Sequence, residues 1–187
     1  MNIYPICIIA SRCHCSLPIA TNHAGAAASG DRYVFFINGR SGATQYSTSR
    51  NQVQRYDIQT NTFALMAASP VARGGMGSAV YMTGFIYLMG GETSTSGASA
   101  SAGRNSAGTF YRCDVYNVLL DQWNVDSNGA PLPLVAQQAS GGGCPDMPTG
   151  MHGIYPVLQG FGVNRILISG GGQNSGVSSS GLVFALA

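Results

Sequence analysis

The chain has 187 residues, of which 45% are hydrophobic and 9% charged, and nine arginines against seven acids give a formal charge of +2. A disordered chain would need low hydrophobicity and high net charge, so this composition predicts a folded protein. The sequence shows no basic stripe of the kind that binds nucleic acid, and no apolar run reaches the roughly 18 residues of a membrane helix. We therefore expect a soluble protein, cytoplasmic or secreted, with neither nucleic acid nor membrane as a partner.

Residues 1–16 are expected to form an irregular N-terminal leader. Their apolar stretch lacks the basic flank and the small-residue cleavage site of a signal peptide. Cys13-His14-Cys15 lacks the spacing of a structural zinc site, so we expect no metal there. The chain has five cysteines, an odd number, which leaves the redox compartment open. For Cys113 and Cys144 the sequence allows two roles, small buried packing residues or an isolated pair.

Three short apolar runs recur along the chain, and each ends in glycine. Aromatic and β-branched residues follow one another in them without polar alternation, which is typical of strands buried on both faces. The runs 33–37, 85–89 and 165–168 are therefore predicted to be central strands. The glycines that close them are Gly39, Gly90, Gly91, Gly170 and Gly171.

A second shared segment follows the first two runs. In it a tyrosine precedes another aromatic residue by seven positions, Tyr56 before Phe63 and Tyr116 before Trp123. The intervening residues 57–61 and 117–121 begin and end with Asp or Asn, which bond to their own backbone and predict hairpin turns. The third copy ends at residue 187 before such an aromatic, so we expect its outer strand to be missing.

Insertions account for the unequal spacing of the copies. The segments 93–109 and 127–146 are rich in small residues and glycine, and we expect them to be exposed loops. The predicted organisation is a leader at 1–16 followed by repeats at approximately 17–67, 68–126 and 147–187.

A period near 50 residues, a glycine doublet that closes an apolar strand, and two aromatics seven apart resemble the kelch repeat of the galactose oxidase/kelch superfamily. The resemblance covers roughly residues 17–186, although Asn38-Gly39 replaces the doublet and Phe63 replaces tryptophan in the first copy. It implies an all-β fold of about three four-stranded antiparallel blades of a β-propeller.

Three blades are an incomplete ring, because propellers typically close with four to eight. Three explanations are open: the chain is a segment of a longer propeller, two copies combine, or the leader covers an open end. We expect the first, and we expect open blade edges to promote self-association.

The candidate binding residues stand at the ends of the predicted strands. His23 and His152 lie near the start of innermost strands, and Arg40 and Glu92 directly follow equivalent glycines. Together they could contact a polar ligand at one mouth of the propeller. The alternative is a solvated rim or an ion pair between blades.

Catalytic signatures are lacking. The resemblance to galactose oxidase raises the possibility of copper held by two Tyr and two His, but that set cannot be placed here, so we expect no cofactor, no metal and no catalytic residue. We therefore expect a binding module whose loops meet a protein or a carbohydrate. The alternative is part of a carbohydrate-active propeller enzyme, an oxidase or a sugar epimerase.

Overall fold

Antiparallel sheets make up nearly all of the regular structure. The computed structural model describes residues 16–42, 48–77, 79–93, 97–132, 140–147, 149–153, 155–158, 165–169, 171–173, 176–177 and 181–185. Within these ranges the only helix is the single 3-10 turn η1 (Ala100–Ala102), which lies in the predicted loop 93–109. No helix of the described part is long and apolar enough to cross a membrane.

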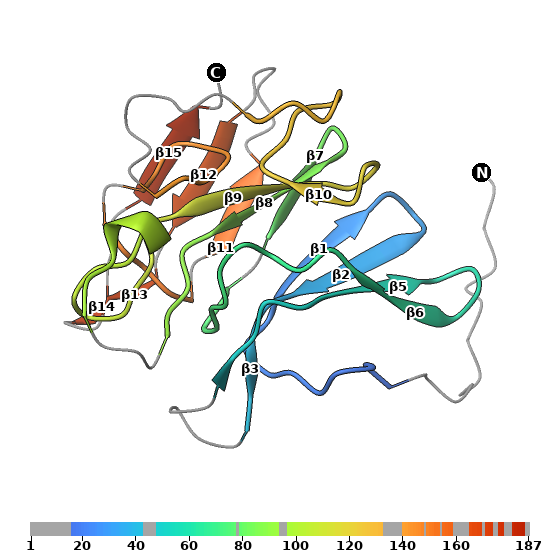
Figure 1. The fold of residues 1–187 in the computed structure, drawn as a ribbon, viewed down its shortest axis with the longest axis horizontal. Coiled ribbons are helices and arrows are strands. Elements are labelled where there is room, and N and C mark those ends of the chain that lie inside the picture. The colour runs from blue at the N-terminus through green and yellow to red at the C-terminus, as the bar shows by residue number, and fades with distance from the viewer. Residues whose placement is uncertain are drawn as a thin grey trace, which may run out of the picture.

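Three sheets follow one another along the chain, from the blue and teal strands of Figure 1 to the red ones. The first contains, in spatial order, β1 (Gly25–Ser29), β2 (Tyr33–Ile37), β5 (Val53–Asp57) and β6 (Thr62–Met66). The second contains β7 (Val80–Met82), β8 (Phe85–Met89), β9 (Cys113–Asn117) and β10 (Gln122–Trp123). The third contains β11 (Tyr155–Leu158), β12 (Arg165–Ser169) and β15 (Gly181–Ala185).

Two short ribbons project from the ends of the second strands. They are β3 (Arg40–Ser41) with β4 (Thr48–Ser49), and β13 (Gly172–Gln173) with β14 (Gly176–Val177). All strand pairs among the described residues are antiparallel, and none of these sheets closes on itself. The predicted central strands therefore match β2, β8 and β12, and the third sheet has three strands within the described residues.

Alternation along β8 explains why its sequence is apolar throughout. Ile86 and Leu88 pack with Phe35 and Tyr116 in the core between the first two sheets. Met89 points the other way, into the core that Ile168 of β12 shares. Successive side chains of a strand face opposite sides, so a strand with a sheet on each side needs apolar residues at every position.

The two predicted hairpin turns form as expected. The Asp57 carboxylate accepts hydrogen bonds from the backbone N–H groups of Gln59 and Thr60, and the Asn117 side chain accepts equivalent bonds in the second sheet. Both turns end on a residue with positive φ, 55° at Asn61 and 54° at Asp121. Asp and Asn tolerate this conformation, which explains their positions in the repeat.

The aromatic residues of the repeat connect neighbouring sheets. Tyr116 is fully buried and its ring meets that of Phe35 edge to face, with centroids 5.8 Å apart. Trp123 packs against the same core and donates a hydrogen bond from Nε1 to the carbonyl of Ala67, 2.9 Å away. In the first sheet, Tyr56 and Phe63 occupy the positions of Tyr116 and Trp123, and their ring centroids lie 5.0 Å apart.

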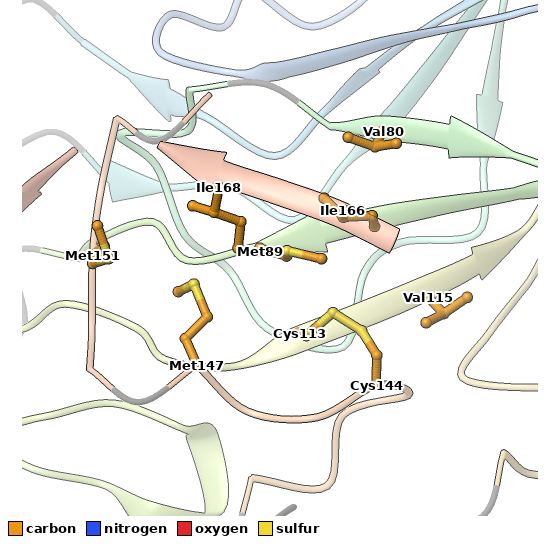
Figure 2. Packing of buried hydrophobic residues seen from close by; sticks show 9 residues of the cluster. All are labelled: Val80, Met89, Cys113, Val115, Cys144, Met147, Met151, Ile166 and Ile168. Carbon is orange, nitrogen blue, oxygen red and sulfur yellow. A yellow bond between two sulfur atoms is a disulfide. The ribbon is translucent and has the colours of Figure 1, made fainter. Parts of the chain in front are cut away.

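A disulfide between Cys113 and Cys144 resolves the two alternatives left by the sequence. Figure 2 shows it at the start of β9, in the core that also contains Met89, Met147 and Ile168. It closes a sequence separation of 31 residues and holds the segment 140–147 against the second sheet.

Reduction of this disulfide should lower the free energy of unfolding by roughly 3–4 kcal/mol. Without the cross-link the unfolded chain is no longer closed into a loop of this length, so its conformational entropy rises. Denaturant unfolding with and without a reductant measures the difference. A double variant, Cys113→Ser with Cys144→Ser, should lose all sensitivity to the reductant. Identical unfolding curves for the native protein under both conditions would contradict the pairing.

Gly91, just after β8, should tolerate a side chain less well than a glycine of similar conformation that has open space around it. Gly91 has φ +101°, and an added Cβ would lie 2.6 Å from the Met76 sulfur and 3.0 Å from the Gly74 carbonyl oxygen. Gly84 has φ +91° and open space around it. An alanine is strained by positive φ at either position, so the difference between the variants reports the crowding alone. Gly91→Ala should therefore destabilise more than Gly84→Ala by about 1–3 kcal/mol. Equal unfolding midpoints for the two variants would refute the close approach.

Candidate functional site

The first strands of the three sheets lie side by side. β7 contacts β1 on one side and β11 on the other. Just before these strands, the N–H of Met76 donates to the carbonyl of His23, and the N–H of Gly153 donates to the carbonyl of Gly75. These segments therefore bring equivalent positions of the three sheets together at the same end of their first strands.

The residue that follows each closing glycine pairs with the segment before the first strand of its own sheet. Arg40 pairs with Asn22, Glu92 with Gly74, and Gly172 with His152. Gly39 and Gly91, at φ +104° and +101°, direct the chain toward this pairing. The sequence predicted that Arg40 and Glu92 occupy equivalent places, and the backbone puts them at equivalent bridges.

Three of the four predicted site residues meet there, and we call Arg40, Glu92 and His152 the polar cluster. The Arg40 guanidinium donates from Nη2 to Glu92 Oε1 and forms an ion pair between the first two sheets. The other oxygen of Glu92, Oε2, lies 3.8 Å from Nε2 of His152. The Arg40 side chain is 8% exposed, against 22% for Glu92 and 29% for His152. The acid and the imidazole thus keep the greater access to solvent.

Glycines make room for each member of the polar cluster. A Cβ on Gly74 would collide with the Arg40 side chain, and one on Gly75 would lie 2.6 Å from Glu92 Oε1. A Cβ on Gly172 would lie 2.6 Å from Cε1 of the His152 ring. The three polar side chains therefore lie flat over backbone that has no side chain of its own.

Hydroxyl groups flank the polar cluster. Ser49 pairs with Arg40 in the β3–β4 ribbon, and its Oγ lies 3.4 Å from Oγ1 of Thr93, the residue after Glu92. The cluster thus combines donors, from Arg40 and the hydroxyls, with acceptors from the Glu92 carboxylate.

His23, the fourth predicted residue, stays apart from the polar cluster. Its ring is exposed, and Nδ1 lies 2.9 Å from the Asn22 side-chain oxygen. His23 has φ 52° at the position that Gly75 and Gly153 fill, at 58° and 59°, in the next two repeats. Within the described residues no group of three or more His, Cys, Asp or Glu side chains could hold a metal ion. Gly170 and the leader residues 1–15 lie outside the described part.

Sequence reasoning missed a buried ion network behind the polar cluster. Arg73 is fully buried and donates from Nη2 to Asp114 Oδ2 at 2.7 Å, and Arg112 donates to the same carboxylate. The guanidinium of Arg73 also reaches the backbone carbonyls of Leu88 and Arg112. Since Arg73 directly precedes Gly74, this network fixes the backbone on which Arg40 lies. No sequence signal links Arg73 to Asp114, although the first sheet has a similar contact: Gln54, the counterpart of Asp114, binds the segment before β1.

Burial and neighbouring charges shift the pKa values of this network in opposite directions. Burial lowers the pKa of Arg73 to about 10, although Asp114 opposes the change. Burial alone would raise the pKa of Asp114, but the charges of Arg73 and Arg112 outweigh it and hold that pKa below its ordinary value. The ionised Asp114 carboxylate therefore offsets the cost of burying the guanidinium groups of Arg73 and Arg112.

Comparison with known proteins supports the fold but assigns neither a family nor a function. No protein family matches this chain, and no curated protein matches it. The solved structure of YjhT, a β-propeller-like protein, is similar to it, with a TM-score of 0.53 and 19% sequence identity. The fold is β-propeller-like. The likeness covers 83% of this chain and 35% of YjhT, so the chain spans about a third of that protein's length.

Asp114→Asn should lower the free energy of unfolding by about 3–5 kcal/mol, because it leaves two buried guanidiniums without a counter-charge. Since the folded pKa of Asp114 lies below the unfolded value of about 3.9, its stabilisation is complete above that pH and is lost as the pH falls toward the folded pKa. Unfolding measured across the acid range should therefore show a shallower decline in the variant. Asp31→Asn, at an exposed aspartate, is the control; a loss no larger than the control's would refute the role of Asp114.

Proposed function

We propose that this chain is a kelch-type propeller module that binds a carbohydrate at the polar cluster. The observation that carries the proposal is the convergence of Arg40, Glu92 and His152 from three successive sheets at the end of the innermost strands. Propeller loops and strand ends at one mouth of the axis are suited to bind a ligand that spans several blades. The glycine doublets and the paired aromatics support the kelch assignment.

The chemistry of the polar cluster favours a ligand rich in hydroxyl groups. A carboxylate and an imidazole accept hydrogen bonds, while a guanidinium and two serine or threonine hydroxyls can donate them. A sugar presents both donors and acceptors on adjacent carbons and can satisfy such a mixed set. Glycine-lined backbone beneath the polar side chains fixes their positions before a ligand arrives, which reduces the entropy lost on binding.

A second candidate is a carbohydrate-active enzyme of the same superfamily. One observation favours it: the Glu92 carboxylate and the His152 imidazole lie close together and are both accessible, as acid–base catalysis requires. Incubating any sugar that binds with the protein, and following its ring protons by NMR, distinguishes the two. Chemical change in the sugar supports the enzyme, and unchanged resonances support the binding module.

The binding proposal is tested with an immobilised panel of neutral and acidic oligosaccharides. The native protein should bind at least one member, and Glu92→Gln should weaken that binding by roughly tenfold or more, since a hydrogen bond to a charged group is worth about 1.5–3 kcal/mol. Asp31→Asn, the same acid-to-amide change at an exposed site, should bind like the native protein. Absence of binding across the panel, or equal affinities in both variants, would overturn the proposal.

A further inference from the structure

The chain contains two Asn-Gly dipeptides, Asn38-Gly39 and Asn128-Gly129, which the fold places in opposite environments. An asparagine before glycine can lose ammonia by itself. The glycine nitrogen attacks the side-chain carbonyl carbon, a C–N bond forms, the amide nitrogen leaves as ammonia, and the nitrogen's proton departs with it. Water then opens the resulting succinimide and leaves aspartate or isoaspartate. The reaction needs an accessible side chain and a glycine nitrogen that is free to approach it.

The first dipeptide, Asn38-Gly39, is buried and hydrogen-bonded. Asn38 is 2% exposed, its Nδ2 donates to the carbonyl of Val71, and its Oδ1 accepts from the Ser69 hydroxyl at 2.6 Å. The attacking nitrogen is also engaged, because the Gly39 N–H donates to the Arg73 carbonyl at 3.0 Å. An added Cβ on Gly39 would lie 2.6 Å from the Asn22 carbonyl oxygen, so no space is left for a ring to form.

The second dipeptide lies in an exposed turn. Asn128 is exposed, and within the described residues its side-chain amide makes no hydrogen bond. The Gly129 N–H makes a long bond, 3.2 Å, to the carbonyl of Asp126. The nearest atom to an added Cβ on Gly129 would be 3.6 Å away, on Leu120, so the ring has room.

We propose that Asn128 is a site of spontaneous modification in the folded protein, where it is converted to aspartate or isoaspartate while Asn38 persists. Ring formation consumes the Gly129 N–H and removes its bond to Asp126. The product adds a carboxylate two residues from Asp126, whose own carboxylate holds the turn through the N–H groups of Asn128 and Ala130. With nine basic and eight acidic residues, the formal charge falls from +2 to +1. The modification therefore places like charges together in the turn that follows β10.

The test compares the two asparagines within one molecule. The folded protein is incubated at mildly alkaline pH, and peptide mapping by mass spectrometry follows replacement of the amide by an acid at each site. Conversion should be at least about tenfold faster at Asn128, since Asn38 can react only after local opening. In the denatured chain the two sites should react at similar rates, which shows that the fold causes the difference.

Asn128→Gln is the matched variant, because it keeps the amide but lengthens the side chain by one methylene. It should abolish conversion at this position and leave Asn38 unchanged. Equal rates at the two asparagines in the folded protein would overturn the proposal. So would an intact Asn128 over a period in which the denatured chain converts both.

Discussion

Hydrogen bonds from the closing glycine of one sheet to the first segment of the next determine how the sheets follow one another. Gly39 donates its N–H to the carbonyl of Arg73, and Gly91 donates to that of Met151. Both glycines have φ near +100°, and both lie too close to the segment before the first strand of their own sheet to allow a Cβ. The direction of the chain after each second strand follows from this contact, and so does the position of the next residue, Arg40 or Glu92.

The same short segment before β7 serves both stability and the polar cluster. Arg73 accepts the glycine N–H through its backbone and binds Asp114 through its side chain, while Gly74 and Gly75 lie beneath Arg40 and Glu92. Burying two arginines against one aspartate is costly, and such a network contributes geometric specificity more readily than net stability. Here it fixes the backbone under the polar cluster, so the proposed binding groups are held in place without a ligand.

The features that depended on local pattern could be predicted from the sequence. Strands β2 and β8 were recognisable from their uninterrupted apolar runs, and the turns at 57–61 and 117–121 because Asp and Asn stabilise them locally. Repeat alignment also placed Arg40 and Glu92 at equivalent sites. The burial of Arg73 could not be predicted, since its partner Asp114 is 41 residues away and no local pattern links them. For the same reason the sequence left the pairing of Cys113 with Cys144 open.

The central claim is that the fold brings Arg40 of the first sheet and Glu92 of the second into contact at the end of the innermost strands. A double-mutant cycle with Arg40→Gln, Glu92→Gln and the combined variant measures this contact directly through the free energy of unfolding. We expect a coupling energy of about 1 kcal/mol or more, because the Arg40 side chain is 8% exposed and that of Glu92 22%. A coupling energy indistinguishable from zero would contradict it, since two residues 52 positions apart would then act independently.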